Sequence, residues 1–131
     1  MVGIDEQTYE SFDRPSGIWH HYVGEFLLAA AESQPESVVV DLLFERWYKD
    51  LVPNHYADLH RGLLALRKNQ IPVVLGVGLE SALEADGSGA SKGFLREVFP
   101  YPAIRAIMRD DKYFGLAIAE KDPDGVLRRQ I

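Results

Sequence analysis

Apolar residues follow two different spacings along the chain. Two nearly continuous apolar runs, at 37–44 and 71–79, are rich in valine and leucine, which is typical of strands inside a parallel sheet. From about 17 to 33, and again from 56 to 68, apolar residues recur every three or four positions, which predicts two amphipathic helices. We expect the first apolar run to be a central strand covered on both faces.

Shorter segments complete the predicted sheet. Ser16 or Gly17 is expected to cap the first amphipathic helix. Asp122-Pro123-Asp124-Gly125 is a strong turn signal, so the C-terminal part is expected to form an antiparallel hairpin. The other assignments are a strand at 2–5, an irregular connection at 45–54, and a loose stretch at 80–93 that contains a surface loop at 85–91. They also include an unassigned stretch at 94–111 and hairpin strands at 113–120 and 126–131.

This order of elements predicts an α/β fold. Strands that alternate with helices imply a mixed, mostly parallel sheet flanked by helices, with the C-terminal antiparallel hairpin added to it. A chain of 131 residues is expected to form a single domain, 1–131. Both ends fall inside predicted strands, which suggests a module cut from a longer polypeptide. The alternative is a compact natural protein whose terminal strands are tied into the sheet.

Composition excludes several classes of function. The net charge is −6, and basic residues are scattered, which argues against a nucleic-acid surface and against docking on anionic lipid. The chain has no cysteine, which excludes disulfides, thiolate nucleophiles and cysteine-based metal sites. No apolar run is long enough to span a bilayer.

Asp5 and Asp41 are the main candidates for chemistry. Asp5 ends the first predicted strand, and Asp41 lies within the second. Ligands collect at the carboxyl ends of parallel strands, so the two carboxylates can face one crevice if these strands are neighbours. Such a pair can hold a divalent metal or act in acid–base catalysis. The structural alternative, which we favour, is that each carboxylate accepts backbone N–H groups or pairs with an arginine.

Two aromatic residues and the four histidines give weaker indications of a site. Trp47 and Tyr48 follow the second strand, where they form either an exposed platform for a ligand or a packing contact with the adjacent loop. The spacing of the histidines does not match a metal-binding helix motif. No cofactor or resident metal is expected, and helix-surface positions are expected for His20, His21, His55 and His60.

Four blocks of sequence together resemble one family. In their order and spacing they are similar to the second type of CHASE domain, a cyclase and histidine-kinase associated sensory extracellular domain. The last block carries an Asp-x-Asp-Gly-x-x-Arg pattern in Asp122, Asp124, Gly125 and Arg128. The segment before the first helix, 13–19, keeps only part of the family pattern. The four blocks are residues 2–6, 38–44, 71–75 and 122–129.

The resemblance implies a sensory module rather than an enzyme. It would lie on the extracytoplasmic face of a bacterial membrane, between helices outside this sequence. The output domain would be a histidine kinase, a nucleotide cyclase, a cyclic-di-GMP enzyme or a Ser/Thr kinase. The expected partner is an unknown small ligand or an extracytoplasmic protein, with Asp5, Asp41, Trp47 and Tyr48 as candidate contacts. The alternatives are a small metal-dependent enzyme using the two aspartates, and a module that only mediates homodimerisation.

Overall fold

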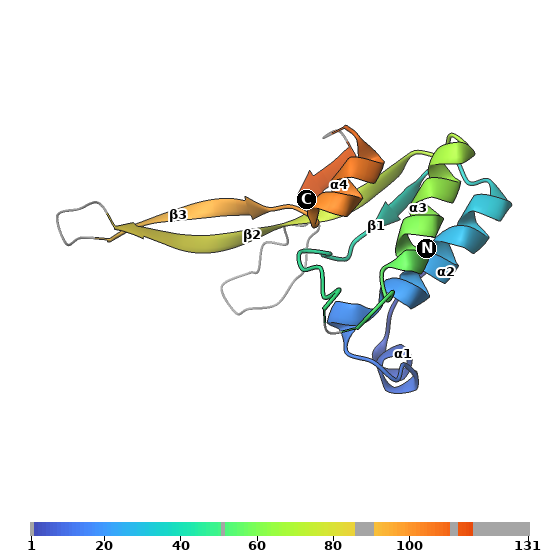
Figure 1. Ribbon diagram of the computed structural model, residues 1–131, viewed down its shortest axis with the longest axis horizontal. Helices are drawn as coiled ribbons and strands as arrows, with labels where there is room; N and C mark the ends of the chain where they lie inside the picture. Colours follow the sequence, from blue (N-terminus) through green and yellow to red (C-terminus); the bar gives the residue numbers. More distant parts are fainter. Residues whose placement is uncertain (1, 51, 86–90, 111–112, 117–131) are drawn as a thin grey trace.

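The architecture is known from a computed structural model, which describes residues 2–50, 52–85, 91–110 and 113–116. Helices and strands alternate along most of this length (Figure 1). In chain order the elements are α1 (Glu6–Ser11), the 3-10 helix η1 (Ser16–Ile18), α2 (His20–Ser33), β1 (Val38–Val40), α3 (Ala57–Lys68), β2 (Val73–Ala85), β3 (Ser91–Val98), α4 (Pro102–Met108) and β4 (Phe114–Leu116).

The sheet is built around β2. Leu75 of this strand is paired with Val40 of β1 and with Phe114 of β4, so these two strands flank β2 on opposite sides, and both run parallel to it. The second half of β2 pairs with β3 in the antiparallel direction, beginning at Gly78 and Val98. The molecule therefore has the predicted α/β fold with a mixed, mostly parallel sheet.

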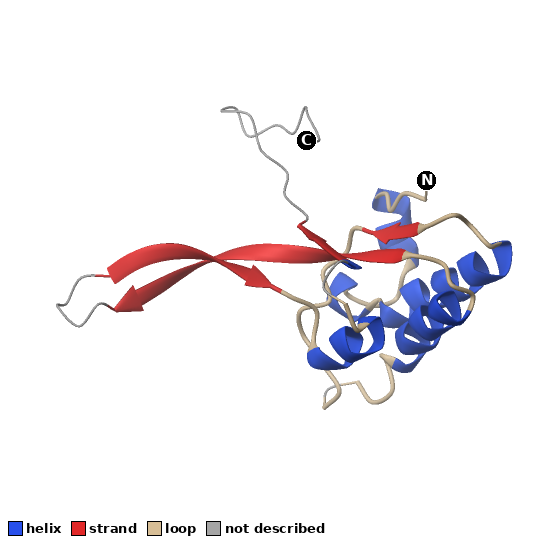
Figure 2. Cartoon of the chain, turned by 90° about the horizontal axis from the view of Figure 1, so that it is seen from above, coloured by secondary structure: helices blue, strands red, loops and turns tan. Residues whose placement is uncertain are grey.

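The core lies between one face of this sheet and the helices α2, α3 and α4. Figure 2 shows the three helices along the same side of the strands. Alternate residues of β1 and β2 point into this layer, and the apolar faces of the helices meet them. Fully burying an aliphatic side chain stabilises a fold by about 1.5–3 kcal/mol. The fully buried aliphatic side chains are Leu27, Leu59, Leu63, Leu66, Leu75 and Ile104.

A two-stranded arm extends from this body. Residues 79–85 of β2 and 91–97 of β3 form the arm, which projects well beyond the helices (Figures 1 and 2). Its side chains include exposed Leu95, and Arg96 pairs with Glu80 across the two strands. The loose stretch predicted at 80–93 is therefore wrong for 80–85 and 91–93, which are strand; the middle of its predicted surface loop 85–91, residues 86–90, lies outside the described residues. Small and charged residues hide the strand pattern there, because an exposed hairpin needs no buried face.

Two strand predictions in the first half of the chain are also wrong. Residues 2–5 form no strand: Val2 is 74% exposed, and Asp5 instead caps the short helix α1. The run at 37–44 forms only the three-residue strand β1, and Val39 in its middle is 72% exposed. Within the described residues β1 pairs only with β2, so it is not the central strand that its apolar sequence suggested.

The remaining elements agree with the sequence in part. The two amphipathic helices are confirmed as α2 and α3, although neither Ser16 nor Gly17 caps α2, because the short helix η1 and Trp19 precede it. Pro102 begins α4 within the stretch left unassigned. Strand β4 confirms the start of the predicted strand 113–120, and the hairpin that should follow lies outside the described residues. In the part of the chain that is described, no helix has the length and apolar character needed to cross a membrane.

Candidate ligand site

A cluster of aromatic and imidazole rings lies beyond the carboxyl end of β1. Its rings come from the chain leaving this strand, from the residues before α3 and the first turn of that helix, from the first residue of α2 and from the residue before α4. Consecutive rings are in contact, with centroid separations from 4.6 to 6.5 Å. We call it the aromatic–imidazole cluster; its members are His20, Phe44, Trp47, Tyr48, His55, Tyr56, His60 and Tyr101.

His20 is the most enclosed member of the cluster. Its side chain is 1% exposed, and its ring centroid lies 4.6 Å from that of His55 and 5.2 Å from that of Phe44. Neither ring nitrogen of His20 has a hydrogen-bond partner. A buried polar atom without a partner costs about 1–3 kcal/mol. Few residues in a folded protein are left in this state without a reason.

His55 is also buried and is held in one orientation. Its Nδ1 lies 2.7 Å from the carbonyl oxygen of Val52, and the carbonyl can only accept a hydrogen bond. Nδ1 therefore carries the proton, which leaves Nε2 as a bare lone pair. That Nε2 is buried and has no partner. The cluster thus contains two buried imidazoles with unused hydrogen-bonding capacity.

Burial determines the charge states of three residues in the cluster. Burial, followed by the nearby His55, lowers the pKa of His20 to about 4. Burial is also the main cause of the lowered pKa of His60, whose Nε2 lies 3.0 Å from the Tyr101 hydroxyl. Burial raises the pKa of Tyr101 above its usual range. At neutral pH the cluster is therefore uncharged at these three positions.

A surface hollow of about 360 Å³ lies next to the cluster. Phe44 and Tyr48 belong to both, because they line the hollow and contact His20 and His55 respectively. The hollow lies where the chain leaves β1, the position at which parallel sheets bind ligands. Charged groups of both signs stand at its edge. Its lining residues are Gly17, Leu43, Phe44, Glu45, Arg46 and Tyr48.

The structure separates the roles of the two predicted aspartates. The carboxylate of Asp5 accepts hydrogen bonds from the backbone N–H and the hydroxyl of Thr8, at 2.8 and 2.7 Å. These bonds, the hydroxyl's first, lower the pKa of Asp5. Asp41 is exposed directly after β1. The shared crevice required two neighbouring strands, and residues 2–5 are not a strand, so this argument for joining the two carboxylates is lost.

The two predicted aromatic residues have different surroundings: Trp47 packs on other rings, and Tyr48 lines the hollow. Trp47 stacks on Tyr101, with centroids 5.4 Å apart and planes 10° apart, and meets the edge of Tyr56. The ammonium of Lys49 lies 5.0 Å from the Trp47 centroid, within cation–π range. Tyr48 is half-buried and lines the hollow. Packing thus accounts for much of Trp47, and Tyr48 keeps the better position for a ligand contact.

The expectation that all four histidines lie on helix surfaces is wrong for two of them. His20 and His55 are buried, and His60 is half-buried beside them. Sequence spacing could not reveal this, because the three rings come together only when α2 packs on α3. The sequence held one signal that His20 is buried. The residue before it, Trp19, is apolar and begins the buried face of the helix. His21 lies on the surface as expected, and His60 does so only in part.

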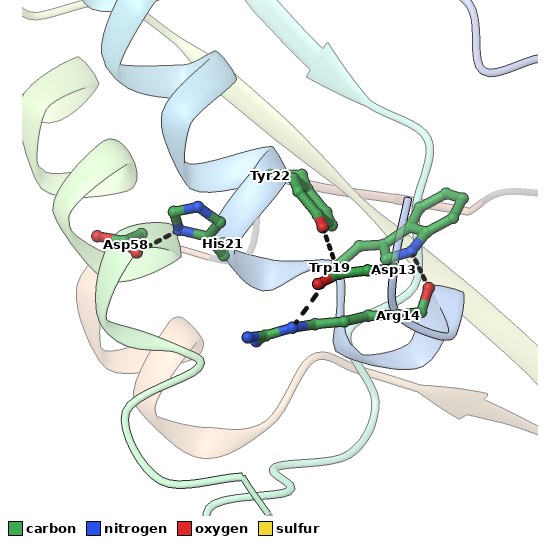
Figure 3. A network of polar contacts seen from close by, with 6 residues as sticks. All are labelled: Asp13, Arg14, Trp19, His21, Tyr22 and Asp58. Atoms are coloured by element: carbon green, nitrogen blue, oxygen red, sulfur yellow. Dashed lines mark hydrogen bonds and ion pairs between the residues drawn. The ribbon is translucent and has the colours of Figure 1, made fainter. Parts of the chain in front are cut away.

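A second polar group joins the outer faces of α2 and α3. Figure 3 shows His21 directed at Asp58, with Nδ1 2.6 Å from a carboxylate oxygen. Within the described residues, only His21, Glu25 and Asp58 bring three metal-ligand atoms within 4.8 Å of one another. Arg61 already lies 3.3 Å from Asp58 and 3.9 Å from Glu25. An exposed ion-pair network therefore accounts for the group.

The other contacts in Figure 3 fix the entry into α2. The Trp19 indole donates a hydrogen bond to the carbonyl oxygen of Arg14 at 2.7 Å. Tyr22 donates one to the carboxylate of Asp13, which lowers the pKa of that carboxyl group. These bonds hold the segment before α2 against the helix, and so they help to position His20 at its first residue.

Comparison with known proteins finds no match: no family model, no curated protein and no solved structure is similar to this chain. The motif residues on which the family resemblance depends most lie outside the described residues; they are Asp122, Asp124, Gly125 and Arg128. The resemblance therefore stays a prediction.

Proposed function

We propose that this chain is a non-catalytic sensory module of a bacterial membrane receptor, placed on the extracytoplasmic face of the membrane. The observation that carries the proposal is the hollow after β1, whose aromatic lining rests on buried imidazoles with unused nitrogens. A site of this form can bind a small ligand and pass a change to the core beneath it. The ordered sequence blocks that resemble the second type of CHASE domain support the same function.

The proposed mechanism is a shift between two arrangements of the chain after β1. Phe44 and Tyr48 are part of both the hollow and the cluster, so a ligand in the hollow changes the packing of His20 and His55. These rings lie at the beginnings of α2 and α3. A ligand that prefers one arrangement shifts the population toward it, and the shift can reach an output domain elsewhere in the receptor.

The test uses the full-length receptor. We expect Glu45→Ala and Arg46→Ala, which change the charged edge of the hollow, to alter signalling output without altering the amount of receptor in the membrane. Lys68→Ala, at the exposed end of α3, is the matched control and should leave output unchanged. A full-length gene with no membrane-spanning segments around this sequence would contradict the proposal.

No observation favours the metal-dependent enzyme as a second candidate. It needs Asp5 and Asp41 together in one cleft, and Asp5 is engaged in capping α1. Homodimerisation remains compatible with the sensory function, because receptors of this kind can work as pairs.

A further inference from the structure

The aromatic–imidazole cluster has a feature that packing alone does not require. A neutral imidazole always carries one N–H, so a buried His20 without a partner keeps a donor and an acceptor unused. An apolar ring of similar size would fill the same space without this cost. The unused nitrogens therefore point to a species that binds there in another state of the protein.

The geometry disfavours a metal ion as that species. Three imidazoles are present, but the only described group with three ligand atoms within 4.8 Å of one another is His21, Glu25 and Asp58. The nitrogens of His20, His55 and His60 therefore do not converge on a common position. A proton needs only one nitrogen, and His20 offers one.

We infer that the aromatic–imidazole cluster is a proton-binding site, and that uptake of a proton by His20 releases the chain after β1 from the core. The inference rests on the proposed sensory function for its biological meaning and names acidification as the signal. It depends on the surroundings of His20, which hold no anion to stabilise a positive charge.

The groups that face the His20 ring explain why a positive charge there is not stabilised. Its ring neighbours are His55, Phe44 and Tyr101, and His60 contacts Tyr101 and also acts on the charge of His20. None of these groups is an anion at neutral pH.

Charges on the neighbouring elements do not help either. His20 is the first residue of α2, where the positive end of the helix dipole opposes a cation. On α2 and α3, Glu25 and Asp58 are paired with Arg61, and Asp58 also with His21. Glu45, on the chain after β1, is exposed at the hollow. A protonated His20 is therefore stable only if its ring reaches water.

The movement of His20 has a defined consequence. Phe44 contacts its ring on one side, and Tyr48 contacts the adjacent His55. When the His20 ring leaves, Phe44 loses its contact directly and Tyr48 is affected through His55, so the hollow that they line changes shape. Burial and the neighbouring His55 lower the pKa of His20 to about 4, so the release is expected as the pH falls from 6.5 toward 4.

The experiment follows the 131-residue chain by tryptophan fluorescence and by histidine NMR between pH 7.5 and 4. Trp47 is stacked on Tyr101 inside the cluster, so its emission reports the release. We expect a reversible change below pH 6.5 with far-ultraviolet circular dichroism retained. His20→Met should abolish the change, and His21→Gln, the neighbouring exposed histidine, should keep it.

Two results would overturn the inference. One is the same fluorescence change in His20→Met; the other is an NMR titration in which His20 gains its proton at pH 6.5 or above. If His20→Met does not fold, the NMR titration of the unaltered chain decides. A change in receptor output with Glu45→Ala but no titration of His20 below pH 6.5 would leave the proposed function standing and reject the proton site. The expected titration with no effect of either Glu45→Ala or pH on output would reject the sensory function and keep the site.

Discussion

A single imidazole at the start of α2 makes the stability of the fold depend on pH. The pKa of His20 is about 4 in the folded chain against 6.5 for an exposed histidine, so the unfolded chain binds more protons between these values. The contribution of His20 is therefore fully present above pH 6.5 and is lost as the pH falls toward 4. The loss is at most about 3.5 kcal/mol, from about 1.4 kcal/mol per pKa unit. The lowered pKa of His60 acts in the same direction.

Urea denaturation at pH 7.5 and pH 5 measures this effect. We expect the free energy of unfolding to fall over this interval in the natural sequence and to fall clearly less in His20→Met. His21→Gln, which removes an exposed imidazole, should retain most of the loss. An equal loss in the natural sequence and in His20→Met would show that other groups cause the acid sensitivity.

Asp5 illustrates a carboxylate whose role is local. Its bonds to Thr8 satisfy the first turn of α1, a helix with no buried residue. We expect Asp5→Ala to increase amide hydrogen exchange in α1 while leaving the urea midpoint of the whole chain unchanged. Asp5→Ser keeps an oxygen that can cap the helix and should restore protection. A large fall in the urea midpoint with Asp5→Ala would indicate a wider role for this carboxylate.

The sequence indicated which residues carry chemistry less well than it indicated the fold. Asp5 was expected as a possible ligand group or a structural acceptor, and the structural alternative is what the hydrogen bonds of Thr8 support. Tyr48 lies at the hollow, and its role as a ligand contact stays a prediction. His20 and His55 were missed, because a cluster assembled from four separate segments leaves no spacing in the sequence.

Helices α2 and α3 approach so closely that each has a glycine at the contact, Gly24 on α2 and Gly62 on α3. A Cβ atom at Gly24 would lie 2.5 Å from the carbonyl oxygen of Asp58 and 2.5 Å from the amide nitrogen of Leu59. Both are backbone atoms that cannot move without shifting α3. Overpacking of a core contact costs about 1–3 kcal/mol, and we expect Gly24→Ala to reach the upper end, about 3 kcal/mol.

The matched control is Gly3→Ala. No atom lies within 4 Å of a Cβ placed at Gly3, so the same chemical change should alter the urea midpoint little. Because the beginnings of α2 and α3 carry His20 and His60, Gly24→Ala should also change the tryptophan emission at neutral pH. A loss of less than about 0.5 kcal/mol, the size of an ordinary surface effect, would mean that the helices separate easily.

Elements with a buried face were predictable from the spacing of their apolar residues, and exposed elements were not. Helix α3 and the first half of β2 each show the apolar spacing that their burial requires. The apolar run at 37–44 predicted a longer, central strand, but only β1 forms, because the chain turns after Val40 to cover the rings of the cluster. The arm was missed because backbone pairing and an exposed ion pair hold it, and neither leaves an apolar pattern in the sequence.

The molecule as a whole divides into a packed body and an arm that adds little to the core. Leu75 is 0% exposed at the centre of the sheet, whereas Phe94 and Leu95 on the arm are 43% and 68% exposed. We expect Leu75→Ala to lower the free energy of unfolding by about 3 kcal/mol, as large-to-small changes in a core do. The double change Phe94→Ser and Leu95→Thr should lower it by less than about 0.5 kcal/mol.

Hydrogen exchange separates the two regions within one sample. Amides of the arm are expected to exchange through local opening, long before those of α3 and the first half of β2, because the arm has few buried contacts to lose. Equal protection along all of β2 would contradict the division. It would show that the exposed side chains Phe94 and Leu95 are covered in solution, and sedimentation at the same concentration would then reveal whether a second copy of the chain covers them.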